Sequence, residues 1–438
     1  MRNLLHSRRG SVAFATVAAM VPLVGAIALG AEAGSWYVTK HHAQNAADAA
    51  AYSGGLRFAC SIAAGSCTDT QSLDYRAKQS AARNSFCNSG DTSYPGSICS
   101  TSLPSGVSQQ VTVASLTSWN GANGNYVQAT VTQQQSAYLS KVLGLSAVNI
   151  RATAVARIDA LAKPPCVLAL KDPITFQGSP TLSSANCGIS SNSTAANAIG
   201  FKGNTGIQVN APSYTVGDCS QTGGNQCSKV QTYQQAIPDP LSALKTAITA
   251  LKTSDFPNKS CGGSTIKSYE TGACYNAGTQ SINSMTLSGT YYFTGNVKIN
   301  GSPLITGTAT LVFFGGGSLT ITGGPTIQLT AMKSPAVPPA LSGVRGLMTD
   351  LLIYDDEPYS SKGVNISGNS ASYFNGTIYV PNSPVTYSGN SSTSAPSTGC
   401  YQLIAYAVTF SGNTYLDNSK CKQDSAATPN VQTVRLVQ

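Results

Sequence analysis

The chain has 438 residues, and only 10% of them are charged, with a formal net charge of +9. A soluble domain ordinarily carries about 25% charged residues, so this composition, with 42 glycines and 20 tyrosines, is typical of exported β-proteins instead. The positive charges are spread thinly, without long runs of one sign, which argues against nucleic-acid binding. The length allows about two or three domains.

The N-terminal segment predicts a transmembrane helix. Three arginines among the first nine residues precede an uncharged run over residues 11–31. As an α-helix this run rises about 32 Å, which is enough to cross the hydrocarbon core of a bilayer. The arginines favour a cytoplasmic N-terminus, and Trp36 and Tyr37 suit the opposite interface. We therefore expect everything after Lys40 to lie on the far side of the membrane.

A cleaved secretory signal is the alternative interpretation of this segment. Ala31-Glu32-Ala33 would pass as a cleavage site, but the apolar region of a signal peptide is about 7–15 residues long, shorter than this run. A prepilin-type cut after Gly10 agrees poorly with Ala15, because type IV prepilins usually carry glutamate at that position. The retained anchor is the favoured interpretation, and cleavage of the N-terminus stays open.

Residues 35–163 predict an alanine-rich helix followed by a small α/β module. From 35 to about 59, alanines recur at spacings of three and four residues and line one face of a helix. Small side chains let helices approach closely, so this stripe packs either on a partner helix or on the chain's own next helix, at about 72–86. The stripe consists of Ala43, Ala46, Ala47, Ala50 and Ala51.

The rest of this module alternates between apolar and polar residues, as half-buried β-strands do. We expect strands over 107–116, 126–132 and 148–158, and a short helix over 136–145 that ends at Gly144. Pro164-Pro165 then marks a domain boundary.

Beyond residue 163 one motif recurs: an apolar or aromatic residue, any residue, glycine, and then Asn, Ser or Gly. Neighbouring copies often stand a little over twenty residues apart, about the length of one coil of a β-solenoid. The glycines have the ordinary role of turn residues that tolerate positive φ. A β-sandwich is the competing fold. The copies begin at Phe176, Phe201, Phe293, Ile299, Ile321, Ile366, Tyr387 and Phe410.

These elements predict a mainly β protein with an N-terminal transmembrane helix. Its domains are a cytoplasmic tip and transmembrane anchor at 1–34, the helix and α/β module at 35–163, and a β-solenoid-like domain at 164–438. A helix-like stretch near 229–253 interrupts the β pattern. We expect it to lie against the solenoid flank or to join two β blocks.

All twelve cysteines follow the apolar run. An even number in an exported chain favours disulfides over metal or redox sites, and no Cys-x-x-Cys occurs. The connectivity stays open at this level. Joining each cysteine to its neighbour gives the candidate pairs Cys60–Cys67, Cys87–Cys99, Cys166–Cys187, Cys219–Cys227, Cys261–Cys274 and Cys400–Cys421.

The sequence predicts no catalytic, cofactor or metal site. No histidine follows His42, which excludes Ser–His–Asp, Cys–His and His-ligated metal sites from the β region. The densest acidic cluster is Asp355-Asp356-Glu357, a weak candidate for calcium binding or for paired carboxylates that hydrolyse glycosides. Its ordinary interpretation is a solvated charged loop.

Tyrosines of the β region have two interpretations, a sugar-stacking strip or ordinary packing on strands, and packing is the favoured one. They are Tyr354, Tyr359, Tyr379, Tyr387, Tyr401 and Tyr406.

Several N-terminal features occur in a characteristic order. They are Arg8-Arg9-Gly10-Ser11, an apolar run, an acidic residue, Trp36-Tyr37 and Gln44-Asn45-Ala46-Ala47-Asp48-Ala49-Ala50. Together they resemble the N-terminal domain of TadE/TadG-like Flp (tight adherence) pilus-assembly proteins. The α/β module, with Lys141-Val142-Leu143-Gly144 before a strand, resembles the pseudopilin-like TadG group. Segments at 166–170, 376–381, 402–405 and 410–413, and Cys187 followed by Asn192-Ser193, resemble the C-terminal β region of some members.

The resemblance implies a single-pass protein of the bacterial inner membrane with a cytoplasmic N-terminus and its bulk in the periplasm. We expect a non-enzymatic protein that assists assembly or anchoring of a Tad/Flp-type pilus, without a cofactor. Its expected partners are pilus-assembly proteins, pilins or secretin, with peptidoglycan or other glycans as further partners and no nucleic acid. The Asp-x-Ser-x-Ser metal site of some TadG-like proteins is absent from the sequence, so metal-dependent adhesion is not carried over.

Two other functions stay open. One is an envelope adhesin or polysaccharide-binding module. The other is a β-helical carbohydrate-active enzyme that uses Asp355, Asp356 or Glu357.

Overall fold

The computed structural model describes residues 8–62, 67, 69–88, 91–100, 102–160, 165–184, 187–203, 207–261, 265–360, 363–389, 400–417 and 432–437. The chain forms two compact units. The first comprises 1–63, 67–160 and 432–438, and the second comprises 64–66 and 161–431. Both the long N-terminal helix and the mainly β character of the remainder agree with the predicted fold class.

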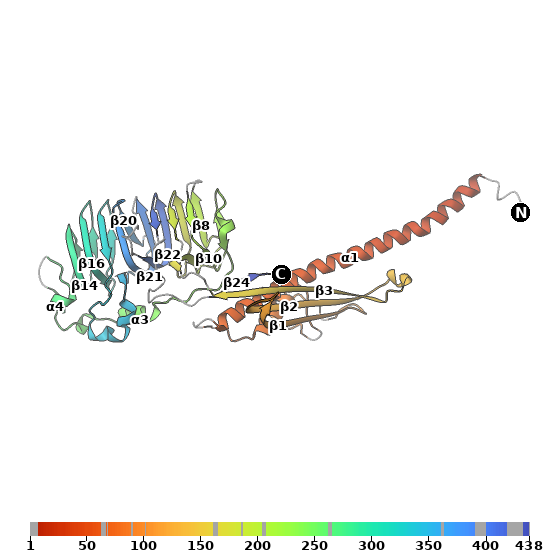
Figure 1. Cartoon of the computed structure of the whole chain (residues 1–438), viewed down its shortest axis with the longest axis horizontal. Coiled ribbons are helices and arrows are strands. Elements are labelled where there is room, and N and C mark those ends of the chain that lie inside the picture. The colour runs from red at the N-terminus through yellow and green to blue at the C-terminus, as the bar shows by residue number, and fades with distance from the viewer. Residues whose placement is uncertain are drawn as a thin grey trace. The chain divides into compact units, whose positions relative to one another are not determined.

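One continuous helix, α1 (Arg8–Ile62), contains both the apolar run and the alanine-rich segment. Figure 1 shows its N-terminal part projecting past the sheet of the first unit, whereas its C-terminal part lies along that sheet. A second helix, α2 (Leu73–Ala82), begins where the sequence predicts, after Ser72, whose hydroxyl accepts a hydrogen bond from the Tyr75 amide.

The sheet of the first unit is antiparallel, with the strand order β1-β2-β3-β24. All three predicted strands are present and longer than predicted, because the ladders continue into polar residues at the strand ends. The helix predicted over 136–145 is confined to the short 3-10 turn η1 (Ser140–Leu143), since β2 itself continues to Ser136. The strands are β1 (Ser108–Trp119), β2 (Ala122–Ser136), β3 (Ala147–Ala160) and β24 (Gln432–Leu436).

The last strand corrects the predicted domain boundary. The sequence places residues 432–438 in the β domain, but β24 pairs with β3, and the second unit is inserted between these two strands. Val434 explains this return, because its side chain is 1% exposed and belongs to the apolar core between α1 and the sheet. A single short strand with one buried residue cannot reveal its partner from its own sequence.

The alanine stripe of α1 is covered within its own unit. All five alanines are fully buried in one core with Ala77 and Ala81 of α2 and with Ala154 of the sheet. Packing on the next helix is therefore confirmed, and the sheet is an additional partner that the sequence did not suggest. The alternative, a partner helix from another protein, is wrong for these residues because no exposed stripe remains.

The second unit consists of parallel strands: every pairing among its described strands is parallel, unlike the antiparallel ladders of a β-sandwich. Its strands form two runs separated by a helical segment. The first run contains β4 (Pro165–Ala169), β5 (Ile174–Gly178), β6 (Thr181–Ser183), β7 (Gly188–Ser191), β8 (Ile199–Gly203), β9 (Gln208–Asn210), β10 (Ser213–Thr215), β11 (Cys219–Gln221) and β12 (Val230–Gln231).

The second run is longer and includes the two longest strands of the unit. It contains β13 (Gln280–Ser281), β14 (Met285–Phe293), β15 (Val297–Ile299), β16 (Leu304–Phe313), β17 (Leu319–Ile321), β18 (Thr326–Thr330), β19 (Leu351–Tyr354), β20 (Val364–Gly368), β21 (Tyr373–Gly389), β22 (Tyr401–Gly412) and β23 (Tyr415–Asp417).

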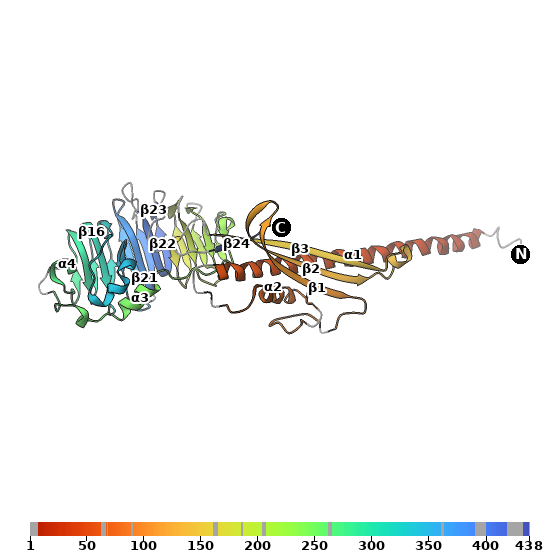
Figure 2. The ribbon, with the colours of Figure 1, turned by 60° about the horizontal axis from the view of Figure 1, so that its bottom comes forward.

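The two runs do not follow one another in space. The end of the second run lies beside the start of the first, because β22 pairs with both β4 and β5 (Figure 2). Leu403 is thereby in register with Val167, whereas β12 and β14 occupy opposite ends of the strand order. This order is not readable from the spacing of the motifs, which only predicts that copies stack.

The recurring motif keeps one register across the junction of the two runs. Phe410 aligns with Phe176, which aligns with Phe201, and the Phe176 ring stacks on the other two at centroid distances of 5.2 and 5.1 Å. Gly412 aligns with Gly178, and both adopt positive φ, as the turn interpretation predicts. Apolar residues of the motif therefore fill the interior of the stack.

The sequence left open whether the helical segment joins two β blocks or lies against their flank, and the structure shows both. It connects β12 to β13, at opposite ends of the stack, and α3 (Ser242–Thr249) buries Leu244 and Ile248 in an apolar cluster on the outward side of the strands. That cluster also takes in the 3-10 helix η4 (Pro339–Met348). The remaining short elements are η2 (Cys227–Lys229), η3 (Thr253–Asp255) and α4 (Tyr269–Gly272).

Candidate functional site

The N-terminal part of α1 is long and apolar enough to cross a membrane. Its large apolar side chains face outward rather than into the first unit: Val17, Leu23 and Ile27 are each more than half exposed. Exposed apolar surface of this extent is costly in water. Among the described residues this is the one helix with these properties.

Glu32, directly after the apolar run, ties the turn between β2 and β3 to α1. Its carboxylate accepts hydrogen bonds from the backbone N–H groups of Tyr138 (2.6 Å) and Ser140 (2.8 Å), with a longer one from Leu139. Carboxylates bind such clustered amides strongly because the hydrogen bonds are charge-assisted. The sequence identified Glu32 only as the acidic residue after the run, and a lone carboxylate gives no signal for a partner so distant in sequence.

Further contacts continue this attachment along α1. The Gln135 side-chain amide donates to the Thr39 hydroxyl at 3.2 Å, and the Gln44 amide donates to the Thr153 carbonyl at 3.3 Å. Lys40 donates to the carbonyl of Arg151, between these two contacts. The β2–β3 hairpin is thus held in a defined register against the helix.

The acidic cluster at 355–357 is not a solvated loop, so that expectation is wrong. Asp355 is fully buried; its carboxylate accepts hydrogen bonds from the amides of Leu319 (2.8 Å) and Glu357 (2.9 Å). Burial raises the pKa of Asp355 to about 7, although the two amide hydrogen bonds oppose this change. These contacts give Asp355 a structural role in joining β17 to the segment after β19.

Asp356 is also engaged. Its carboxylate accepts hydrogen bonds from the hydroxyl of Tyr354 and from the side-chain amide of Asn382, both at 3.1 Å. In the described part of the chain, no three His, Cys, Asp or Glu side chains come together as ligands for a metal ion. The carboxylates of Asp355 and Asp356 therefore lie in a hydrogen-bonded network.

Five of the candidate disulfides are present among the described residues, and they follow the pairing of neighbours. Each closes a short loop, with sequence separations from 7 to 21 residues. The sixth candidate pair includes Cys421, which lies outside the described residues. The observed pairs are Cys60–Cys67, Cys87–Cys99, Cys166–Cys187, Cys219–Cys227 and Cys261–Cys274.

Most of the tyrosines named in the sequence are packing residues. Tyr354, Tyr379 and Tyr401 are fully buried, as is Tyr387. Tyr359 differs, because it is 61% exposed and its ring lies 5.2 Å from that of the half-buried Tyr406. Ordinary packing is thus confirmed for the buried tyrosines, and no continuous strip exists.

A cleft of about 540 Å³ surrounds this tyrosine pair in the second unit. Lys171 lies over the Tyr406 ring, with its ammonium 5.8 Å from the centroid, and Lys245 also lines the cleft. Neither lysine forms an ion pair with another described residue. The full lining is Leu170, Lys171, Asn192, Asp239, Lys245, Pro358, Tyr359, Pro381, Asn382 and Tyr406.

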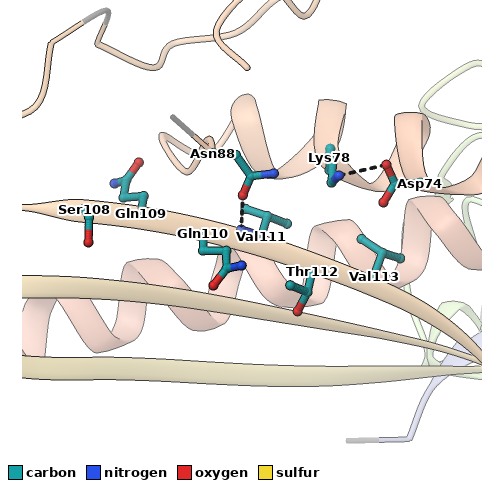
Figure 3. A pocket seen from close by; sticks show the side chains of 9 residues that line it. All are labelled: Asp74, Lys78, Asn88, Ser108, Gln109, Gln110, Val111, Thr112 and Val113. Carbon is teal, nitrogen blue, oxygen red and sulfur yellow. Dashed lines mark hydrogen bonds and ion pairs between the residues drawn. The ribbon is translucent and has the colours of Figure 1, made fainter. Parts of the chain in front are cut away.

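The first unit has a shallow hollow between α2 and the edge strand β1 (Figure 3). Its charged groups pair with each other, since Lys78 lies 2.9 Å from Asp74. The Asn88 side-chain oxygen accepts a hydrogen bond from the Val111 amide and so covers part of the open strand edge. These groups are already satisfied, which makes the hollow a poor ligand site.

Residues 10–64 match the family Tad, described as putative Flp pilus-assembly TadE/G-like. The match coincides with α1 and confirms the resemblance predicted from the N-terminal sequence. No curated protein and no solved structure matches the chain significantly. The TadE/G-like segment thus includes the apolar run, Glu32 and the buried alanine stripe.

Proposed function

We propose that this chain is a non-enzymatic, membrane-anchored envelope protein that assists assembly or anchoring of a Tad/Flp-type pilus. One observation carries the proposal: the TadE/G-like match falls on α1, whose N-terminal part is apolar and exposed. In this proposal residues 11–31 cross the inner membrane with the arginines in the cytoplasm. Both units lie in the periplasm, a compartment in which their disulfides persist.

In this proposal the protein acts by binding other envelope components and not by chemistry. The first unit, a long helix packed on an antiparallel sheet, serves as a pseudopilin-like module. The second unit is interpreted as a β-solenoid, an interpretation supported by its parallel ladders and by motif copies in register. Its surfaces would contact pilins, assembly proteins, secretin or peptidoglycan.

Deleting the gene is expected to abolish pili or strongly reduce their number, as counted by electron microscopy of whole cells. Complementation with the natural sequence should restore them. The double variant Leu23→Arg/Ile27→Arg should not, because each arginine at the centre of a span costs about 2.5–3.5 kcal/mol of insertion free energy. The control variant Leu23→Met/Ile27→Val keeps the span apolar and should restore pili. Normal pili in the deletion strain would contradict the proposal.

A second candidate function is glycan binding at the cleft that contains Tyr359 and Tyr406. An exposed and a half-buried aromatic ring beside amide and ammonium groups are suited to stacking on a sugar and hydrogen bonding to its hydroxyls. The full chain in detergent should co-sediment with peptidoglycan sacculi. Each Tyr→Ala change in the cleft should weaken binding by about 0.5–1.5 kcal/mol, or roughly 2- to 12-fold. Tyr233→Ala is the control, since Tyr233 is exposed but does not line the cleft; equal binding by all variants would exclude this site.

A further inference from the structure

The turn between β2 and β3 is unusually apolar for an exposed turn. Tyr138 is 71% exposed, and Leu139 and Leu145 are 44% and 46% exposed. These three side chains flank the short 3-10 turn η1, and Lys141 within that turn is exposed as well. Large apolar side chains gathered at one turn mark a surface that contacts another phase or another molecule.

The contacts of Glu32 determine where this turn lies along α1. Three consecutive backbone amides of the turn point at the carboxylate that ends the apolar run. The hairpin also runs alongside α1 toward the helix N-terminus, as both views show (Figures 1 and 2). The exposed apolar side chains are therefore at the level where residues 11–31 would leave a bilayer.

Charges around the turn favour a lipid headgroup layer. Lys40, Lys141 and Arg151 are exposed at this end of the first unit. Glu32 is the acidic group of α1 that lies at the turn, and its carboxylate is occupied by the turn amides. Basic side chains interleaved with tyrosine and leucine are the composition that binds the interface of an anionic membrane.

We propose that the β2–β3 turn is a second membrane contact of this protein. Tyr138, Leu139 and Leu145 enter the interfacial layer of the bilayer that α1 crosses, and Lys141 pairs with lipid phosphate. Glu32 acts as the positioning residue that holds the turn at this depth. With helix and turn both engaged, the first unit cannot swivel about the helix axis, so its sheet presents a constant face to partners. This inference rests on the proposed membrane anchoring by α1.

The chain carries its own reporters for a test of this contact. It has two tryptophans, Trp36 beside the predicted interface and Trp119 at the opposite end of β2 from the turn. Three full-chain variants would each contain one tryptophan: Trp119→Phe, Trp36→Phe, and Trp36→Phe/Trp119→Phe/Tyr138→Trp. They would be placed in nanodiscs of phosphatidylglycerol and phosphatidylcholine, the latter brominated near the glycerol end of its acyl chains. Bromine quenches tryptophan only at close range.

We expect the tryptophan at 138 to lose about half of its emission, as Trp36 does, while Trp119 loses almost none. Quenching of Trp36 without quenching at 138 would overturn the turn contact and leave the anchor intact. Absence of quenching at Trp36 would instead contradict the anchor itself. Leu145→Trp in the same double-phenylalanine background provides a second reporter in the turn, with the same expected loss.

The role of Glu32 has a separate readout. Glu32→Ala is added to the variant with tryptophan at 138. Quenching of that tryptophan should fall by at least half, because the turn amides lose their acceptor and the turn is no longer held at the bilayer. In the Trp119→Phe background, Glu32→Ala should leave the quenching of Trp36 unchanged. If quenching at 138 is the same with and without Glu32, the positioning role is wrong.

Discussion

Replacing Phe176 by alanine is expected to lower the free energy of unfolding of the second unit by about 3–5 kcal/mol. The Phe176 side chain is fully buried at the junction of the two strand runs. Its ring stacks on Phe201 from its own run and on Phe410 from the other, with interplanar angles of 12° and 11°. Alanine removes both stacking contacts and leaves a cavity between strands that are not adjacent in sequence.

Denaturant unfolding of the full chain in detergent, followed by circular dichroism, would measure this loss. Tyr359→Ala is the control because Tyr359 is exposed on the same unit, and its effect on stability should stay within about 0.5 kcal/mol. Phe293→Ala provides a second comparison. Phe293 is buried and stacked on Phe313 at 5.0 Å, away from the junction. A loss below about 1 kcal/mol for Phe176→Ala would contradict the role assigned to the junction.

The second large effect is expected from Gly55→Leu in α1, which should lower the free energy of unfolding of the first unit by about 1–3 kcal/mol. A Cβ atom at Gly55 would lie 2.8 Å from Val434 Cγ1 of β24 and 3.1 Å from Ala156 Cβ of β3. The helix lies so close to the sheet at this point that a side chain must separate them. The strand most affected would be β24, which is short and is an edge strand of the sheet.

Gly34→Leu is the matched control on the same helix, because nothing lies within 4 Å of a Cβ atom at Gly34. Leucine is the better helix former by about 0.8 kcal/mol, so this change should be neutral or stabilising. Thermal unfolding followed by tryptophan emission reports on the first unit, which contains both tryptophans. Equal unfolding midpoints for Gly55→Leu and Gly34→Leu would show that the helix and sheet are not packed closely here.

Much of the fold was predictable because its signals are local. Alanines at helical spacing predicted the buried face of α1, and alternation of apolar and polar residues predicted β1, β2 and β3. The motif glycines predicted turns, and their apolar neighbours predicted a stacked interior, because each copy of the motif repeats the same local geometry. Neighbouring cysteines pair for a related reason: short loops keep them close.

The functional surfaces were less predictable, because each depends on contacts between distant residues. Asp355 occurs in an acidic cluster that a sequence suggests is solvated, yet Leu319 supplies a buried amide for its carboxylate. Tyr359 has the same residue type as the buried Tyr379, and only their positions on the folded strands distinguish them. Glu32 gives no sequence signal for the turn amides that it binds.

By itself the sequence determined a long apolar helix, a small sheet, a repeating β region and a TadE/G-like N-terminus. These follow from the periodicity and composition of contiguous segments, which set the preferred backbone geometry and the buried face of each element. Tertiary structure alone decided that β22 joins β4, that β24 returns to β3 and that the β2–β3 turn binds Glu32. Strand edges and carboxylates can accept many partners, so the packing of the whole chain selects among them.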